Sequence, residues 1–280
     1  MGEPMAGHLL AAGHHLTVWN RTAAKSVPIQ QKGAEVAESL ETLAPECDTV
    51  FLCVGRTEDV DECTSAMMGT ANPGTLFVDH STISPEGAVA IGAKLRSAGL
   101  RFMDAPITGG SMGAQKGQLT IFCGGDVSDF DEVLPILQAY AKRAELVGGL
   151  GSGQTTKIAN QIAVGGALLA LCESLAFAHK AGLDVAKTRD VLSGGAAGSW
   201  AFENYGPKIL AEDWSPGFSI KNQRKDFGYA LESAKALQAK VPGTELVDAL
   251  LGELDKAGFG ESTTALLYKL MAQGEPETWT

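Results

Sequence analysis

Hydrophobic residues in the first half of the chain gather into short runs that alternate with segments of helical length. Several runs are apolar throughout, which is typical of strands covered by helices on both faces of a parallel sheet. We expect strands at 16–20, 49–54, 75–81, 101–107 and 119–125, with a weaker candidate at 144–149. Helical segments lie between them, for example at 85–99 and 126–141. This alternation predicts a doubly wound α/β domain.

The pattern changes near Gly153, after which strand-like runs almost disappear. Residues 154–181 predict one long helix that is apolar nearly all round and therefore buried on several sides. Shorter helices are expected at about 184–193, 199–211, 221–239, 243–257 and 262–273. We place the boundary in the glycine-rich stretch 148–154, which predicts an α/β domain at 1–150 and an all-helical domain at 151–280. Since an uncovered apolar helix needs a second subunit, we expect a homodimer or homotetramer.

Composition narrows the class of protein. The 280 residues are 45% hydrophobic and 20% charged, and the net charge of −11 disfavours a nucleic-acid or anionic-membrane partner. No uninterrupted apolar run reaches the roughly 20 residues of a membrane span, and no export signal is visible. The five cysteines include no CxxC pair, so we expect neither a disulfide framework nor a zinc site, and a cytoplasmic location.

The N-terminus reads as a dinucleotide-binding unit of the Rossmann type without its first strand. Gly2 fits the third glycine of GxGxxG, and a helix and the strand 16–20 follow it in the usual order. Because the absent strand would be central in the sheet, we expect about nine preceding residues, with Met1 an internal methionine. The alternative is that the protein lacks this strand and is a non-catalytic member of the fold, since two phosphate-binding glycines are then absent.

The residues after the strand 16–20 bear on the choice of cofactor. An acidic residue at this place binds the ribose hydroxyls of NAD, whereas a basic residue pairs with the 2′-phosphate of NADP. The chain has Asn20, Arg21 and Thr22 here, with Lys25 one helical turn further on. Arg21 is a planar donor suited to phosphate, so we expect NADP(H) to be preferred, with NAD(H) as the alternative.

Four motifs then occur in order along nearly the whole chain. They are the N-terminal MGEPMAGHLLAAGHHLTVWNRT, DAPITGG at 104–110, GSGQTTKIANQ at 151–161, and Lys225-Asp226 after Phe218. With these motifs the chain resembles the β-hydroxyacid dehydrogenase family, which includes 3-hydroxyisobutyrate dehydrogenase and 2-hydroxy-3-oxopropionate reductase. The resemblance implies a Rossmann-type domain, an all-helical domain built on a long interdomain helix, and an NAD(P)-dependent oxidoreductase.

The third motif carries the chemistry. Lys157, Asn160 and Gln161 stand at i, i+3 and i+4, which places three polar groups on one face of an otherwise apolar helix. Burying an ammonium without a partner is costly, so we expect Lys157 to face a cleft. The resemblance implies that Lys157 is the general acid–base residue and that Asn160 holds the substrate. A lysine at this position also disfavours imine reductase chemistry by the same resemblance.

The second motif follows a strand, where doubly wound sheets bind their ligands. Thr108, Gly109 and Gly110 offer a hydroxyl and backbone N–H groups with little bulk, which suits a substrate carboxylate. The family more often has serine at the place of Thr108, so we expect the preferred substrate to differ.

The resemblance assigns the remaining site residues to the cofactor. These are Gly2, Met5, Asn20, Arg21, Thr22, Val54, Gly55, Thr82, Phe218, Lys225 and Asp226. Three other residues have two interpretations each: Arg56 meets phosphate or solvent, Trp200 lines a substrate pocket or packs in the core, and Lys221 substitutes for Lys225 or is solvated. His80 is expected to be structural.

Together these features predict an enzyme that reduces a short aldehyde acid with NADPH: tartronate semialdehyde (2-hydroxy-3-oxopropionate), glyoxylate or succinic semialdehyde. The alternative within the class is oxidation of 3-hydroxyisobutyrate with NAD. Decarboxylation of 6-phosphogluconate is disfavoured because that relative has a much longer helical domain. The expected partners are a small carboxylate substrate and a second copy of the chain.

Overall fold

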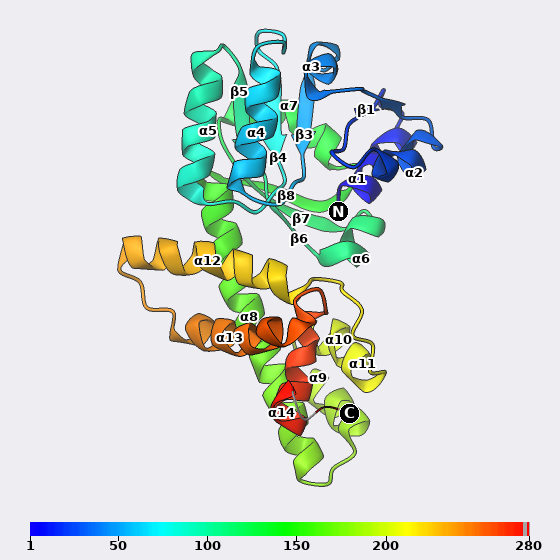
Figure 1. Ribbon diagram of the computed structural model, residues 1–280, viewed down its shortest axis with the longest axis vertical. Coiled ribbons are helices and arrows are strands. Elements are labelled where there is room, and N and C mark those ends of the chain that lie inside the picture. Colours follow the sequence, from blue (N-terminus) through cyan, green and yellow to red (C-terminus); the bar gives the residue numbers. More distant parts are fainter. Residues whose placement is uncertain (277–278, 280) are drawn as a thin grey trace. The chain divides into compact units, whose positions relative to one another are not determined.

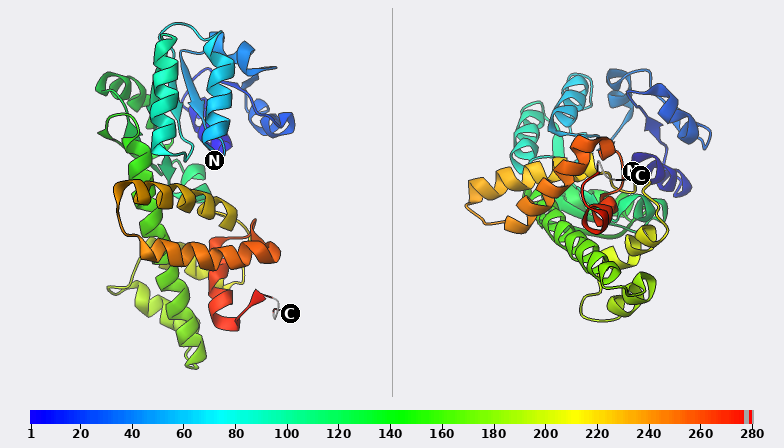
Figure 2. Two further views of the ribbon diagram at one scale, coloured as in Figure 1. Left: turned by 60° about the vertical axis from the view of Figure 1, so that its left-hand side comes forward. Right: turned by 60° about the horizontal axis from the view of Figure 1, so that its bottom comes forward.

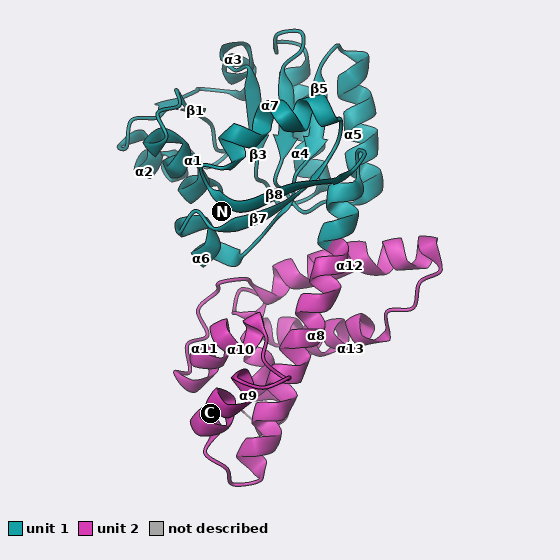
Figure 3. Ribbon diagram, turned by 180° about the vertical axis from the view of Figure 1, so that it is seen from behind, with its two compact units in different colours: residues 1–157 teal, residues 158–280 magenta. Residues whose placement is uncertain are grey.

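The computed structural model describes residues 1–276 and 279 (Figure 1). The chain forms two compact units, unit 1 at 1–157 and unit 2 at 158–280 (Figure 3). The division falls inside the long helix α8 (Ser152–Lys180), whereas the sequence suggested a boundary before that helix. The first turns of α8 therefore belong with the α/β unit, because buried side chains of that unit hold them.

Unit 1 contains a six-stranded sheet whose strands follow the order β3-β4-β5-β7-β6, with β8 paired to β7. The strands are β3 (Thr49–Leu52), β4 (Leu76–Asp79), β5 (Arg101–Asp104), β6 (Ile107–Thr108), β7 (Leu119–Gly124) and β8 (Ala141–Gly148). The pairs β3·β4, β4·β5 and β7·β8 are parallel, but β7 runs antiparallel to β5 and β6. The sheet is thus mixed, not wholly parallel as the apolar runs suggested.

Two of the predicted strands need correction. The run 101–107 divides into β5 and β6 at Ala105-Pro106, since proline has no N–H to donate to a strand ladder. The weak candidate at 144–149 belongs to β8, which is the longest of the strands in the described part of the chain.

The N-terminal strands form a sheet of their own. β1 (Thr17–Val18) pairs in parallel with β2 (Glu35–Val36), and this two-stranded sheet shares no ladder with the larger one among the described residues. β2 was not predicted, because it is two residues long and both are exposed. β3 ends the larger sheet on the side where β1 lies in Figure 1, which is where the expected first strand would pair.

Helices cover both faces of the larger sheet of unit 1 (Figure 2). The helices of unit 1 before α8 are α1 (Gly2–Ala11), α2 (Val27–Gln30), α3 (Leu40–Leu43), α4 (Thr57–Met68), α5 (Pro85–Ser97), α6 (Gly110–Gln115) and α7 (Val127–Leu137), with 3-10 turns η1 (Ala23–Ser26) and η2 (Ala44–Glu46). Alternate strand residues point to opposite faces. Val50, Phe77 and Phe102 therefore pack with α4 and α5, whereas Val78 and Met103 pack with α1 and α7.

Unit 2 is helical, with one isolated bridge between Ser219 and Thr263 in its described part. Besides its share of α8 it contains α9 (Val185–Ser193), α10 (Trp200–Asn204), α11 (Gly206–Leu210), α12 (Ile220–Leu237), α13 (Pro242–Leu254), the π-turn η3 (Asp255–Phe259), the 3-10 turn η4 (Thr264–Leu266) and α14 (Leu267–Gln273). The helix predicted at 199–211 is two helices that meet at Tyr205, two residues before Pro207.

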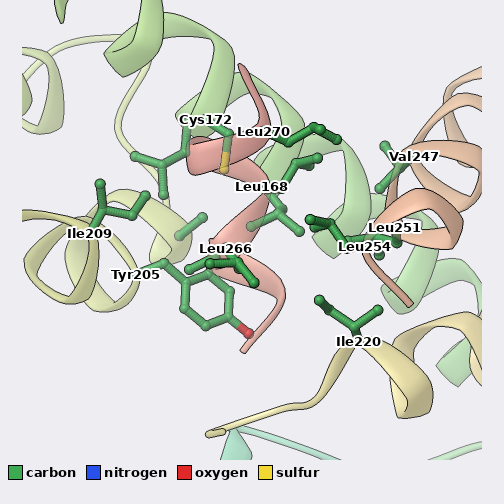
Figure 4. Packing of buried hydrophobic residues seen from close by; sticks show 14 of the residues in the cluster. Leu168, Cys172, Tyr205, Ile209, Ile220, Val247, Leu251, Leu254, Leu266 and Leu270 are labelled. Atoms are coloured by element: carbon green, nitrogen blue, oxygen red, sulfur yellow. The ribbon is translucent and has the colours of Figure 1, made fainter. Parts of the chain in front are cut away.

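Helix α8 supplies one side of the core of unit 2. Leu168, Leu171, Cys172 and Leu175 are fully buried and meet side chains from α11, α13 and α14 (Figure 4). By length and composition α8 is apolar enough to cross a membrane, although polar residues interrupt its apolar runs. The core helix of a soluble protein passes the same test, so the absence of a membrane partner stays a prediction.

Candidate functional site

In unit 1, three of the predicted cofactor segments lie together at the carboxyl ends of β3 and β4. The start of α1 adjoins the end of β3, since a side chain added at Gly2 would lie 3.7 Å from Cβ of Cys53. The N–H of Val54 donates to Oγ of Ser81 at 2.9 Å, which joins the loop after β3 to the loop that carries Thr82. This edge of a parallel sheet, next to a helix N-terminus, suits a dinucleotide.

Gly55 closes this edge at the start of α4. The N–H of Arg56 donates to Oδ2 of Asp59 at 3.0 Å, which caps the helix. A Cβ at Gly55 would lie 2.8 Å from the same oxygen, so a larger residue would displace the cap. Arg56 itself is exposed.

Arg21 lies beside two carboxylates that the sequence analysis did not single out. Its Nη2 donates to Oδ1 of Asp59 at 3.2 Å and to Oε2 of Glu62 at 3.0 Å. The Arg21 side chain is 64% exposed, so solvent screens both ion pairs. Oδ1 of Asn20 accepts from the N–H of Thr22 at 2.9 Å, and this turn fixes the loop that carries Arg21.

The N-terminus of α8 is held by Asp104, the last residue of β5. Its two carboxylate oxygens accept from the N–H groups of Gly151 and Gln154, each at 2.7 Å. Burial raises the pKa of Asp104 to about 6, although these N–H groups favour its ionised form and act in the opposite direction. A side chain at Gly153 would lie 2.4 Å from the carbonyl oxygen of Phe122, so only glycine allows this close approach.

Gln154 joins the first turn of α8 to the loop after β4. Its Nε2 donates to the carbonyl oxygen of Ser81 at 2.8 Å, and its Oε1 accepts from the N–H of Ile83 at 3.1 Å. Gln154 is fully buried, so both bonds are shielded from water. Lys157 follows one turn along α8 and is only 6% exposed. The predicted acid–base residue therefore stands on a turn that is tied to the predicted cofactor loop.

The second motif forms a tight turn between β6 and α6. Gly109 and Gly110 have φ values of +128° and +65°, a conformation that residues with a side chain rarely adopt. Thr108 pairs with Thr120 of β7 and is half-buried. The turn thus presents backbone rather than side-chain bulk, as a carboxylate site requires.

His80 is a structural histidine, as expected. Its Nδ1 lies 2.6 Å from the carbonyl oxygen of Ala105, and its Nε2 lies 2.8 Å from the hydroxyl of Tyr140. Burial lowers the pKa of His80 to about 4, so the ring is neutral at pH 7. Nδ1 is then the donor to Ala105, and Nε2 accepts the hydroxyl proton of Tyr140.

In unit 2, four polar side chains from α8 and α12 form a continuous chain of contacts. Nδ2 of Asn160 donates to Oε1 of Gln161 at 2.8 Å, and Nε2 of Gln161 donates to Oδ2 of Asp226 at 2.7 Å. Oδ1 of Asp226 lies 3.1 Å from Nζ of Lys225, which also lies over the ring of Tyr229. Residues predicted for substrate and for cofactor are therefore linked through Gln161.

The other two residues considered on this side have different surroundings. Lys221 is exposed and pairs with Glu261 at 3.4 Å, so the geometry favours the solvated reading. Phe218 is half-buried, and its carbonyl oxygen accepts from the N–H of Thr264 at 3.3 Å.

A pocket of about 190 Å³ lies within unit 2. Its lining consists of Asn160, Ala163, Val164, Ala167, Trp200, Ala201 and Tyr205. Trp200 meets Tyr205 edge to face at 5.3 Å and remains 47% exposed, which favours the pocket-lining reading over core packing. The polar side-chain groups of the lining residues are the amide of Asn160, the indole N–H of Trp200 and the hydroxyl of Tyr205.

The described residues include no group of three His, Cys, Asp or Glu side chains placed to bind a metal ion. All five cysteines are free thiols.

Comparison with known proteins agrees with the two-part organisation. Residues 1–149 match the family described as the NAD binding domain of 6-phosphogluconate dehydrogenase. Residues 151–271 match the family described as the NAD-binding domain of NADP-dependent 3-hydroxyisobutyrate dehydrogenase.

Similar full-length proteins are found in bacteria and plants. A probable mitochondrial 3-hydroxyisobutyrate dehydrogenase-like protein of Arabidopsis thaliana is 38% identical over 96% of this chain and 82% of its own length. The 2-hydroxy-3-oxopropionate reductase of Escherichia coli is 38% identical over 87% of this chain and 84% of its own length. A structure of Mycobacterium tuberculosis 3-hydroxyisobutyrate dehydrogenase with L-serine has a TM-score of 0.88 and 28% identity, covering 97% of this chain and 95% of that one.

Proposed function

We propose that this chain, which belongs to the family of NAD(P)-dependent β-hydroxyacid dehydrogenases, reduces a short aldehyde acid to a hydroxyacid with NADPH. The observation that carries the proposal is the placement of Lys157. This lysine is buried on the first turns of α8, and Asp104 and Gln154 hold those turns against the predicted cofactor loop.

The cofactor would be held by the edge that Gly2, Val54, Gly55 and Thr82 form in unit 1. The fit rests on the close approach of α1 to the end of β3 and on the glycine at position 55, where a side chain would collide with the helix cap. When bound, NADPH supplies the hydride that reaches the carbonyl carbon of the substrate.

Lys157 has the acid–base role in this proposal. In reduction its ammonium donates a proton to the carbonyl oxygen, which becomes the hydroxyl of the product. In oxidation its amine accepts that proton. Because the side chain is 6% exposed, bulk water has little access to the group that exchanges the proton.

The substrate carboxylate would bind at Thr108, Gly109 and Gly110. The two positive φ values open the backbone N–H groups of this turn to a ligand, and the Thr108 hydroxyl adds a donor. The methyl group of threonine narrows the space beside the carboxylate, which favours a small acid.

Arg21 supports a preference for NADP(H). Nη2 is shared by Asp59 and Glu62, and the other N–H groups of the guanidinium fork can meet a 2′-phosphate. The same two carboxylates lower the positive potential at this place, and this observation favours a second candidate, oxidation of 3-hydroxyisobutyrate with NAD.

The test is a screen of the purified protein with C2 to C4 aldehyde acids and with 3-hydroxyisobutyrate, each with NADPH or NADH and their oxidised forms. We expect the highest kcat/KM for a short aldehyde acid with NADPH. A higher kcat/KM for 3-hydroxyisobutyrate with NAD would select the second candidate. No turnover with any pair, while the cofactor still binds, would identify a non-catalytic member of the fold.

A further inference from the structure

The chain of side chains in unit 2 has a fixed direction. A carboxylate has only acceptors and an ammonium only donors, so the Asp226–Lys225 end cannot be reversed. Gln161 must therefore turn Nε2 toward Asp226, which leaves its Oε1 to face Asn160. Asn160 in turn must present Nδ2 to that oxygen.

Burial prevents this hydrogen-bond direction from changing. Gln161 and Asp226 are 3% and 2% exposed, so water cannot replace a lost partner. Turning either amide by 180° would set two oxygens, or two N–H groups, against each other in a buried place, which folded proteins avoid.

We propose that Gln161 and Asp226 are positioning residues that fix the amide of Asn160 so that its Oδ1 is the atom offered to a ligand. Oδ1 can accept a hydrogen bond from a hydroxyl of the substrate but not from its carboxylate, which has no proton to donate, so this oxygen recognises a substrate hydroxyl. This inference rests on the proposed function for the class of substrate.

The surroundings of Asn160 agree with this assignment. Asn160 lines the unit 2 pocket beside Ala163, Val164 and Ala167, which offer no competing acceptor side chain. Tyr205 also lines the pocket, but a hydroxyl that enters beside these three apolar side chains can bond Oδ1 of Asn160, and an analogue without the hydroxyl leaves that acceptor unsatisfied.

An acceptor at Asn160 distinguishes two of the short aldehyde acids. 2-Hydroxy-3-oxopropionate and 3-oxopropionate differ by one hydroxyl, and both keep the aldehyde and the carboxylate. We expect kcat/KM at saturating NADPH to favour the hydroxylated acid by about tenfold or more.

Variants that exchange the carboxylate and the amide between positions 161 and 226 test whether these residues orient the amide of Asn160 or only pack against it. Asp226→Asn lets the amide of Gln161 turn either way, and Gln161→Glu places two carboxylates together. The double variant restores the direction, because the new carboxylate at position 161 accepts from Asn160 and from the new amide at position 226.

We expect each single variant to lose most of the preference for the hydroxylated acid and the double variant to return to within about threefold of the original ratio. Equal losses for both acids, without recovery in the double variant, would reduce Gln161 and Asp226 to packing residues.

Neutron diffraction of the deuterated protein reads the amide orientation independently of activity. The expected map shows deuterons on the Asn160 atom that faces Gln161. The reverse orientation would overturn the inference whatever the protein catalyses. Failure to reduce either acid would instead overturn the proposed function, and the map would still decide the orientation.

Discussion

Two buried glutamines on the same helix differ in what they hold. Gln154, in unit 1, bonds the backbone of Ser81 and Ile83, so it fixes the path of a loop. Gln161, in unit 2, bonds the side chains of Asn160 and Asp226, so it fixes the orientation of an amide. A backbone anchor sets where groups lie, whereas a side-chain anchor sets which atom they present. Substitution of Gln154 should therefore act mainly on stability and substitution of Gln161 mainly on selectivity.

The largest expected effect of pH on stability concerns the buried titratable groups of unit 1. The pKa of Asp104 is raised from 3.8 to about 6, so its folded form keeps a proton that the unfolded chain loses, and its contribution to stability falls as pH rises from about 4 to 6. The pKa of His80 is lowered from 6.5 to about 4, so its contribution rises across about pH 4 to 6.5. Each amounts to about 3 kcal/mol, and the two largely cancel.

Replacing Asp104 or His80 should reveal the contribution of each residue to the free energy of unfolding, measured in urea between pH 4 and 7. Relative to the unsubstituted protein, we expect the unfolding free energy of Asp104→Asn to rise with pH and that of His80→Gln to fall. Difference curves that are flat for both variants would show that neither group has a shifted pKa.

The next effect compares the two glutamines directly. Gln154→Ala leaves two buried backbone groups without a partner, and we expect it to lower the unfolding free energy by about 2–4 kcal/mol. Gln161→Ala removes one partner of the Asp226 carboxylate but leaves its contact with Lys225, and we expect about 1–2 kcal/mol. Gln118→Ala, at an exposed glutamine, is the control and should change stability by less than about 0.5 kcal/mol. A larger loss for Gln161→Ala than for Gln154→Ala would contradict the comparison.

The smallest effect concerns the exposed ion pairs of Arg21. Arg21→Ala should lower the ratio of kcat/KM for NADPH over NADH by about tenfold, because a phosphate partner is lost. Glu62→Gln should raise the same ratio by about twofold, since one competing carboxylate is neutralised, and added salt should reduce this gain. Equal changes with both cofactors would remove Arg21 from the recognition of the 2′-phosphate.

The sequence predicted the elements of the fold better than their directions. Apolar runs located β3, β4, β5 and β7, but hydrophobicity does not encode whether neighbouring strands run parallel or antiparallel. β2 was missed because a two-residue exposed strand has no hydrophobic pattern. The break between α10 and α11 had a signal in Pro207, which was read as part of one helix.

The candidate site shows a similar division. The motifs contain Asp104 and Gln154, yet their roles depend on bonds between residues that lie far apart in the chain. Such pairs follow from the packing of α8 on the sheet, which local spacing does not reveal. Spacing alone predicted that Gln161 lies on the polar face of its helix. It could not predict that Gln161 bonds Asp226, which lies on another helix.

The most direct test of the central claim is single-turnover reduction by Lys157→Ala, with NADPH bound and a short aldehyde acid in excess. The proposal that Lys157 donates the proton predicts a loss of about 10²–10⁴ in the rate of NADPH oxidation, with the Kd for NADPH within about threefold of the original. A rate within about threefold of the unsubstituted protein would contradict it.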